Sequence, residues 1–443
     1  MPRIWRPRAG DASGMEDPWR GGLRGASEET ARAAGSVWVH AASLGEVAAA
    51  RGWIEALLAR GYRPPFLLTT RTRTGLDRAR ATWGDRVAAR IAPHDFPQTV
   101  GAVLDDACPW RLDIIETELW PNLIAEARAR GVAVVIVGGT VSEGTTARLL
   151  RTRVAGADLF GEGVYALPQS DRHAARFHRL GIPLEHIRVI GDLKASAARP
   201  HGTGESAGGS RTPFASRPAL VFGSLRPGEE RAARLLADAL EAHRVRAGGT
   251  GAGVGAGGRA RGPFDGRDRA VLVVAPRHSG TEASLRAALE GAGFEVLVRD
   301  EGSRGGESVG SWIESVAARP GRRAALLATR GELPDAYDDA WGAVVGGTLA
   351  PYGGHNVWEP AARECPVIVG PHHADVDGAV DALRAEGGGI AVADERHLVQ
   401  AVEGWLRDLD LELRGRSASR AATVAAGAAP RGADALQAWG LTP

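Results

Sequence analysis

Short apolar runs alternate with amphipathic stretches along the first half of the chain. The runs have the length and the β-branched content of buried strands, and most of the stretches between them carry apolar residues at helical spacing. The predicted strands of this half are Val37–Ala41, Pro65–Thr69, Val87–Ala92, Leu112–Ile115, Val132–Val137 and Ile187–Ile190. Such strand–helix alternation is typical of a parallel, doubly wound sheet.

A second series of apolar runs repeats this pattern in the other half of the chain. Its predicted strands are Ala219–Phe222, Val271–Ala275, Glu295–Val298, Ala324–Leu327, Ala343–Val345, Val367–Val369 and Ile390–Val392. We therefore predict an α/β protein with two Rossmann-like, doubly wound domains that face each other across a cleft. In such folds ligands bind beyond the carboxyl ends of the strands.

Polar, glycine-rich segments set the predicted domain boundaries. Residues 1–35 precede the first strand as a truncated or flexible N-terminal segment, residues 36–195 form the first domain, and residues 217–425 form the second. The segment 196–216 is rich in Gly, Ser and Pro, which predicts a linker. The segment 247–266 is mostly Gly, Ala and Arg, so we expect a disordered insertion that cannot bury enough apolar surface to fold.

The overall composition excludes several classes of protein. Lys and Arg total 54 against 53 for Asp and Glu, and this balance argues against a general nucleic-acid binder. The two cysteines, Cys108 and Cys365, lie in different halves and cannot form a disulfide framework or a zinc site by themselves. No stretch approaches the ~20 apolar residues that a membrane-spanning helix needs.

Two residue types are almost absent, and the few that remain are informative. Lys194 is the only lysine, and Asn122 and Asn356 are the only asparagines. All three fall inside motifs described below. We interpret them as residues kept for chemistry that Arg or Asp cannot supply, although survival by chance is the alternative.

Two motifs of the first half place acidic residues just after predicted strands. In His40-Ala-Ala-Ser43-Leu-Gly-Glu46, the spacing of Ser43 and Glu46 matches a helix capping box, and on spacing alone the cap is favoured over a catalytic base. Glu116 and Glu118 follow the strand Leu112–Ile115, where acids often face a site. Two neighbouring carboxylates would raise the pKa of one of them, which suits proton transfer, but solvated loop acids are the alternative.

The second set of motifs is cationic or glycine-rich. Lys194 follows a Gly turn after a strand and can meet an anion as a point charge, and Arg277 with His278 follows another strand and can contact a phosphate. A strand ends in Gly346-Gly347, and the pair Gly353-Gly354 opens a helix. This arrangement favours close approach of the backbone to a phosphate, with amides of the helix N-terminus pointing at it. Glu359 could then accept hydrogen bonds from ribose hydroxyls, and a tight turn with an Asn356 cap is the alternative.

Taken together, these motifs resemble the family of 3-deoxy-D-manno-octulosonic acid (Kdo) transferases of lipopolysaccharide assembly. The resemblance runs from about Val37 to about Asp394. It rests on the segments HAASLGE, ETELWPNLI, VIGDLK, PGEE, APRH, GEL, GGTLAPYGGHNVWEP and VGPH, of which ETELWPN and GGHNxxEP are the most specific. The chain departs from the family pattern at Thr140, Arg226, Thr281 and Asp375.

The resemblance implies an inverting, metal-independent glycosyltransferase that moves Kdo from CMP-Kdo to a lipid A precursor. By this similarity Glu46 is the general base, and Glu116 and Lys194 stabilise the transition state. The residues implied in CMP binding are Pro276, Arg277, Arg330, Gly331, Glu332, Asn356, Val357, Trp358 and Glu359. No cofactor is implied besides CMP-Kdo itself, which is the donor substrate.

The resemblance also implies that the protein associates peripherally with the cytoplasmic face of the inner membrane, because the acceptor is a lipid. We expect the aromatic and basic residues of the N-terminal segment to meet an anionic interface. These residues are Trp5, Arg6, Arg8, Trp19 and Arg20. Two other functions fit the same pattern: a transferase or epimerase that uses another nucleotide sugar, and a non-catalytic remnant that binds a nucleotide.

Overall fold

The computed structural model describes residues 35–116, 119–154, 159–198, 212–249, 266–304 and 306–442. The chain forms two compact units. The first contains residues up to Ile190 together with Pro430–Pro443, and the second contains Gly191–Ala429. Glu118 and the aromatic and basic residues predicted to meet a membrane lie outside the described residues.

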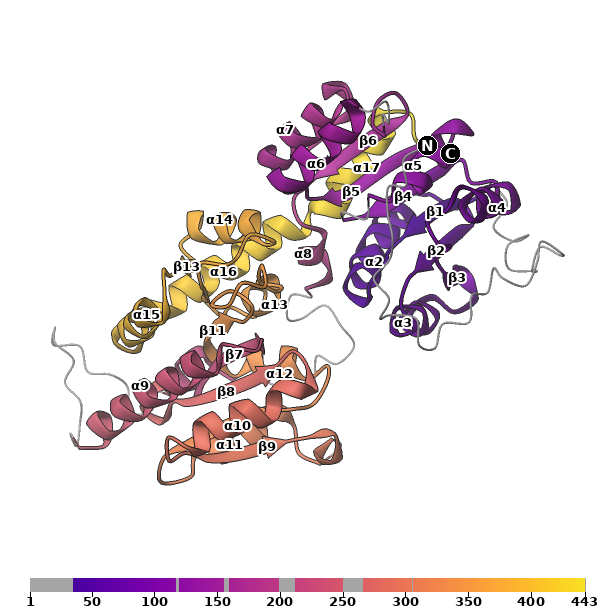
Figure 1. Cartoon of the computed structure of the whole chain (residues 1–443). Helices are drawn as coiled ribbons and strands as arrows, with labels where there is room; N and C mark the ends of the chain where they lie inside the picture. The colour runs from indigo at the N-terminus through magenta and orange to yellow at the C-terminus, as the bar shows by residue number, and fades with distance from the viewer. Residues whose placement is uncertain are drawn as a thin grey trace. The chain divides into compact units, whose positions relative to one another are not determined.

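In the described residues, the first unit is built on a six-stranded sheet of order β3-β2-β1-β4-β5-β6 (Figure 1). All neighbouring strands pair in parallel. The strands are β1 Val37–His40, β2 Phe66–Thr70, β3 Ala88–Ile91, β4 Arg111–Ile115, β5 Ala133–Gly139 and β6 Val164–Pro168. The order reverses direction at β1, as it does in doubly wound folds.

Helices cover both faces of this sheet because its strands are apolar on both sides. The helices are α2 Leu44–Ala59, α3 Arg73–Trp83, α4 Pro97–Ala107, α5 Pro121–Ala129, α6 Glu143–Val154, α7 Asp171–Leu180 and α17 Ala428–Ala438. On one face Trp38, Leu112 and Val134 pack in a core with α4 and α5. On the other face α2 inserts Trp53, whose indole N–H donates to the buried carboxylate of Asp113 at 2.9 Å.

The last strand of the first unit differs from the prediction. We expected Ile187–Ile190 as a strand, but that segment makes only an isolated bridge, from Ile187 to Ala166. The place beside β5 belongs to Val164–Pro168, which the sequence analysis missed. The chain after Ile187 therefore runs along the edge of β6 without joining the sheet.

The end of the chain returns to the first unit and packs against it tightly. In Figure 1, the C-terminal helix α17 lies beside β5 and β6 of this unit. A Cβ on Gly432 would lie 2.7 Å from the Trp53 ring. Arg111 donates to the carbonyl of Leu441 at 2.6 Å, and Arg60 forms an ion pair with Asp434 at 2.7 Å.

Among the described residues, the second unit holds a seven-stranded parallel sheet of order β13-β12-β11-β7-β8-β10-β9. The strands are β7 Ala219–Leu225, β8 Val271–Pro276, β9 Glu295–Arg299, β10 Arg323–Leu327, β11 Ala340–Val345, β12 Val367–Val369 and β13 Gly389–Ala391. Here the order reverses direction at β7, which lies between β8 and β11. The predicted α/β class with two doubly wound, parallel sheets is confirmed.

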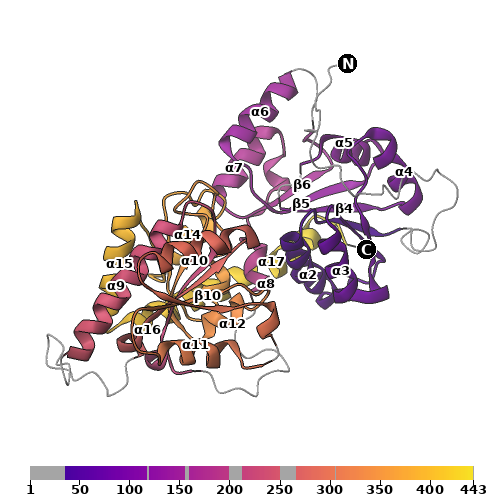
Figure 2. The same ribbon diagram turned by 60° about the horizontal axis from the view of Figure 1, so that its bottom comes forward.

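Helices again form a layer on each face of the second sheet. They are α8 Leu193–Ala197, α9 Glu230–Gly249, α10 Glu282–Glu290, α11 Val309–Ala317, α12 Leu333–Asp338, α13 Trp358–Ala361, α14 Asp377–Ala385, α15 Glu395–Arg407 and α16 Leu411–Ala426. Alternate residues of β7 divide between two cores. Leu220 and Phe222 pack with α9, α10 and α15, whereas Val221 packs with α11 and α12. Figure 2 shows α10 and α11 on opposite sides of β10 in this unit.

The predicted boundaries differ from the divisions of the structure. The segment predicted as linker, 196–216, begins inside α8 and ends in the 3-10 turn Phe214–Ser216, and residues 199–211 between them lie outside the described part. The predicted insertion 247–266 begins in the last turn of α9, and residues 250–265 are not described. The second unit ends at Ala429 rather than at 425. None of the described helices has the length and apolarity needed to cross a membrane.

Candidate functional site

The predicted acids of the first unit lie where the strand order of its sheet reverses. β1 and β4 are neighbours, with His40 in register with Ile114. Glu46 lies in the first turn of the helix that follows β1, and Glu116 directly follows β4. Crevices at such a switch point are the usual ligand sites of doubly wound sheets. The fold therefore brings both predicted residues to one edge of the sheet.

Glu46 is held by a modified capping box. Ser43 is the N-cap of α2 and accepts a hydrogen bond from the Glu46 amide at 3.3 Å. The Glu46 carboxylate accepts from the Ala42 amide at 2.7 Å and from the Ser43 hydroxyl at 2.9 Å. Its side chain is thus fixed, and the residue is only 8% exposed. The capping interpretation is confirmed, and the role of base stays a prediction beside it.

Glu116 has a strained backbone. Its φ is +61°, in the left-handed region that residues other than Gly, Asn and Asp seldom adopt. Its amide donates to the carbonyl of Val137 at 2.8 Å, so the turn is anchored to β5. Strained turns of this kind cluster at functional sites, because the surrounding structure must offset their cost. This observation favours a functional role for Glu116 over a solvated loop acid.

His40 is a buried neutral group at the end of β1. It is fully buried, and its Nδ1 lies 2.9 Å from the hydroxyl of Thr69. Burial, together with the positive charge of Arg71, lowers the pKa of His40 to about 3. Its ring packs edge-on against Trp120 with centroids 4.5 Å apart. His40 therefore packs against Trp120, the N-cap of α5, and stays uncharged at neutral pH.

The second unit presents its predicted residues at the corresponding switch point, between β7 and β11. Gly346 follows β11, and a Cβ there would collide with the carbonyl oxygen of Ser224 at the end of β7. Only glycine permits this close approach. Ser224 itself has a φ of +57°. The two strand ends are therefore locked together at the edge where ligands are expected.

A carboxylate of the protein itself accepts hydrogen bonds from the amides of the glycine-rich loop. Glu229 is fully buried, and its carboxylate accepts from the amides of Arg226 at 2.9 Å and Gly347 at 2.9 Å. It also accepts from Thr348 at 3.1 Å, Leu349 at 3.0 Å and Ala350 at 3.4 Å. Glu229 therefore satisfies the amides of residues 347–350, whereas the predicted phosphate contact at the N-terminus of the helix after Gly353-Gly354 stays a prediction.

Three arginines gather at the carboxyl edge of the second sheet. Arg226 follows β7, Arg277 follows β8, and Arg330 follows β10. Within the described part of the chain, no acidic side chain lies within ion-pair distance of any of the three. Uncompensated positive charge at a strand edge favours binding of an anion.

Two histidines have pKa values that burial and this positive charge lower. Partial burial, with Arg277, Arg226, His278 and Lys194, lowers the pKa of His355 to about 4. The pKa of His278 is also lowered, by desolvation first and then by Arg226, Arg277 and Arg330. Both imidazoles are therefore neutral at neutral pH. Arg226, Arg277, Lys194 and the two histidines consequently share one electrostatic environment.

Lys194 is tied to the second glycine pair through an aspartate. Asp192 is the N-cap of α8 and accepts from the Lys194 amide at 2.8 Å. The other carboxylate oxygen of Asp192 accepts from the indole N–H of Trp358 at 2.8 Å. The VIGDLK and GGHNVWEP motifs, far apart in sequence, therefore meet in one place.

The residues around Trp358 divide into half-buried and buried groups. Asn356 accepts from the Trp358 amide at 3.0 Å, as expected for a cap, and donates to Glu359 at 3.2 Å. Burial raises the pKa of Glu359, although Asn356, Arg363 and Arg277 oppose the shift. The side chains of Val357 and Trp358 pack in the core. Only the backbone of these two residues remains for the predicted contact with a nucleotide.

Glu332 forms an ion pair with Arg299. Its two oxygens accept from Arg299 at 2.9 and 3.0 Å, and Thr329 donates to it at 2.7 Å. Hydrogen bonding to Arg299 lowers the pKa of Glu332. Its neighbour Gly331 has a φ of +85°, which turns the backbone between Arg330 and α12. Glu332 therefore holds the turn that presents Arg330.

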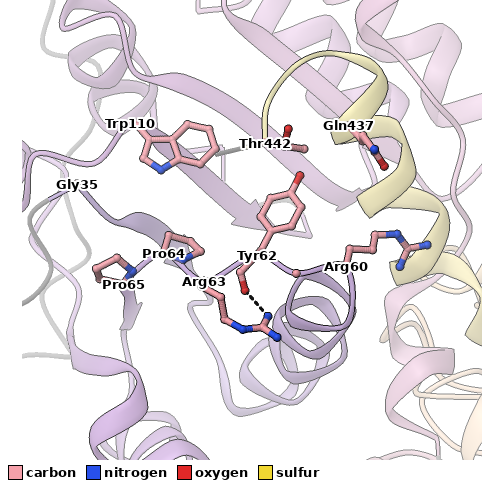
Figure 3. Close-up of a pocket in the computed structure, with 10 residues that line it drawn as sticks. Gly35, Arg60, Tyr62, Arg63, Pro64, Pro65, Trp110, Gln437 and Thr442 are labelled. Atoms are coloured by element: carbon pink, nitrogen blue, oxygen red, sulfur yellow. Dashed lines mark hydrogen bonds between the residues drawn. The ribbon is translucent and has the colours of Figure 1, made fainter.

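A cavity of about 700 Å³ in the first unit lies away from all predicted site residues (Figure 3). Tyr62, Arg63 and Trp110 line it, at the amino ends of β2 and β4. Arg63 turns back and donates to the carbonyl of Tyr62 at 2.7 Å. Within the described residues, no group of three or more His, Cys, Asp or Glu side chains could hold a metal ion.

Sequence reasoning gave no role to Glu229 or His355, although both fall inside quoted motifs. Arg226 was noted only as a departure from the family pattern. A signal was present for Glu229, because an acid after Pro-Gly at the start of a helix is a common cap. Its partners lie about 120 residues away, and nothing in the sequence identifies them.

Comparison with known proteins supports one family. A family model described as 3-Deoxy-D-manno-octulosonic-acid transferase (kdotransferase) matches residues 18–197. The 3-deoxy-D-manno-octulosonic acid transferase of Bordetella pertussis is 33% identical, and the match covers 98% of this chain and 95% of that protein. The transferase of the same name from Haemophilus influenzae is 26% identical, over 76% of this chain and 70% of its own.

Among solved structures, the UDP-GlcNAc 2-epimerase from Neisseria meningitidis bound to UDP-GlcNAc superimposes with a TM-score of 0.55. It is 12% identical, and the match covers 91% of this chain and 99% of that one. At this identity the likeness concerns the fold alone. The family assignment rests on the Bordetella relative, which matches along nearly the whole chain. The protein therefore belongs to the 3-deoxy-D-manno-octulosonic acid transferase family and is a glycosyltransferase that acts on Kdo.

Proposed function

We propose that the chain transfers Kdo from CMP-Kdo to a lipid A precursor, by an inverting displacement that needs no metal ion. The observation that supports CMP-Kdo as the donor is the uncompensated positive charge of Arg226, Arg277 and Arg330 in the second unit. A nucleotide-activated acidic sugar is an anionic ligand that such an edge attracts. Family membership supports Kdo as the sugar.

In the proposed reaction Glu46 takes the proton from the acceptor hydroxyl. The hydroxyl oxygen forms a bond to the anomeric carbon of Kdo, and the bond from that carbon to the phosphate oxygen breaks. CMP leaves with the electron pair. Glu116 and Lys194 stabilise the charge that develops, and the arginines neutralise the leaving phosphate in place of a metal. We assign the nucleotide to the residues of the second unit named by the family resemblance.

The proposal places the protein at the cytoplasmic face of the inner membrane, because its acceptor is a lipid. The experiment that tests the donor is a thermal-shift comparison of CMP, UMP, UDP and GDP. CMP at 100 times its dissociation constant is expected to stabilise the protein by about 2.7 kcal/mol, and UDP to have little effect. Equal stabilisation by UDP would favour a transferase or epimerase that uses another nucleotide sugar.

Activity is tested with CMP-Kdo and a tetra-acylated lipid A precursor, and the configuration of the product by NMR. We expect inversion at the anomeric carbon and the same rate with and without EDTA. A rate that EDTA abolishes and magnesium restores would contradict the metal-free mechanism. Binding of CMP without any transfer would indicate a nucleotide-binding remnant.

A further inference from the structure

Arg226 is held more firmly than the other arginines of the cationic edge. Its amide donates to the buried carboxylate of Glu229 at 2.9 Å. Its guanidinium contacts the Nε2 atom of His278 on one side. On the other side its Cζ lies 4.3 Å from the centroid of the Tyr352 ring, which is a cation–π distance. A residue anchored at its backbone, with its guanidinium held on two sides, is preorganised for a ligand.

The contact with His278 also defines the roles of the two side chains. A guanidinium has only donors, so Nε2 of His278 must accept. Acceptance requires a neutral imidazole, and the lowered pKa of His278 agrees with that requirement. His278 therefore orients the Arg226 fork without adding a charge or a competing anion.

One nitrogen atom of Arg226 and one of His355 still have hydrogen-bonding capacity. The Nε of Arg226 and the Nε2 of His355 are buried and have no hydrogen-bond partner in the described part of the chain. Gly347 lies between the two side chains: a Cβ there would be 3.2 Å from the His355 ring and 3.4 Å from Cγ of Arg226. Buried polar atoms are normally paired, so each of these nitrogens calls for a partner, and an oxygen of a ligand can supply it.

Three acids from the motifs of this unit are engaged elsewhere. Glu229 is bonded to loop amides, Glu359 accepts from Asn356, and Glu332 accepts from Arg299. The positive charge of Arg226 is therefore not cancelled by the protein. An anion supplied by the substrate is needed to balance it.

From this geometry we infer that Arg226, oriented by His278 and Tyr352, is a subsite for the carboxylate of the donor sugar, separate from the residues that hold the CMP phosphate. The inference rests on the proposed function. CMP-Kdo carries two anions, the phosphate and the carboxylate of the octulosonic acid, and both are attached to the same carbon. Arg277 and Arg330 remain for the phosphate. The planar fork of Arg226 matches the two oxygens of a carboxylate. Arg226 thus selects an acidic sugar over a neutral one.

The test separates the two anions by measuring two constants on the same variants. In Arg226→Gln, the KM for CMP-Kdo and the inhibition constant of CMP are determined in one transfer assay. We expect the KM to rise about 10- to 100-fold, the usual range for loss of a charged hydrogen bond, with the CMP constant changed by less than about 3-fold. Arg226→Lys keeps the charge but loses the fork, so it is expected to give an intermediate KM.

The control is Arg286→Gln, which removes an exposed arginine paired with Glu290 on α10 of the same unit. It is expected to leave both constants unchanged. If CMP inhibition weakens as much as the KM rises, Arg226 binds the phosphate and the inference is wrong. If neither constant changes, Arg226 is structural and the inference is also wrong. Failure of the wild-type protein to use CMP-Kdo would instead refute the proposed function itself.

Discussion

Replacement of Glu46 by Gln separates the two roles that the residue can have. As a cap, Glu46 accepts from the Ala42 amide and the Ser43 hydroxyl. Gln can keep both contacts, because its carbonyl oxygen accepts from Ala42 and its amide group donates to the Ser43 hydroxyl oxygen, which has free lone pairs. As a base, Gln cannot accept the proton at all.

The expected magnitudes differ by several kcal/mol. Exchange of two charge-assisted hydrogen bonds for neutral ones lowers the free energy of unfolding by about 1 to 2 kcal/mol. Loss of a general base lowers turnover by about 10²–10⁴-fold, which corresponds to about 3 to 5 kcal/mol in the activation barrier. Stability and turnover therefore change by distinct amounts in the same variant.

The assay measures turnover, CMP affinity and urea stability of Glu46→Gln beside Ser43→Ala. Ser43→Ala removes the cap partner but leaves the carboxylate, so it is expected to lose about 1 kcal/mol of stability and little turnover. CMP affinity is expected to stay constant in both variants. Turnover of Glu46→Gln above about one tenth of wild type would refute the role of base, and Glu116 would become the candidate.

Three other changes test parts of the structure. Glu229→Gln turns a donor group toward buried loop amides, so it is expected to lower the free energy of unfolding in urea by about 3 to 5 kcal/mol. The control Glu230→Gln changes a half-buried neighbour and is expected to lower it by less than about 1 kcal/mol. Equal losses in the two variants would contradict the role given to Glu229. Asp113→Asn leaves the fully buried Arg111 without its countercharge and is expected to cost about 3 to 5 kcal/mol; a loss below about 1 kcal/mol would show that the pair is dispensable. The pKa of His40 is about 3 in the folded protein, below its unfolded value, so its contribution to stability is complete above pH ~6.5 and is lost as the pH falls, by about 3 kcal/mol at pH ~4.5. His40→Gln is expected to lose this slope in acid melting curves, and an unchanged slope would assign the acid sensitivity to other groups.

The doubly wound sheets could be predicted because each buried parallel strand is a nearly continuous apolar run. Glu116 and Arg277 could be singled out because they directly follow such runs, and Glu46 because it lies in the first turn of the helix after one. The segment Val164–Pro168 was missed because a proline ends its apolar run. Ile187–Ile190 was mistaken for a strand because its apolar alternation is real, but its partner edge offers only one bridge.

Long-range contacts could not be predicted from the sequence. Whether the amides after Gly347 face a ligand or the protein depends on Glu229, which lies 118 residues earlier in the chain. The place of α17 likewise depends on a glycine that fits against Trp53. Periodicity describes which face of an element is apolar, but it does not identify what packs against that face.

The return of the C-terminal helix to the first unit has a consequence for synthesis of the protein. The chain leaves the first unit after Ile190 and re-enters it at Pro430. During translation the first sheet emerges early, but the face around Trp53 waits for Gly432, which follows Ala429, the last residue of the second unit. The unit that is made first is therefore the last to be finished. Until α17 arrives, the apolar face around Trp53 stays uncovered.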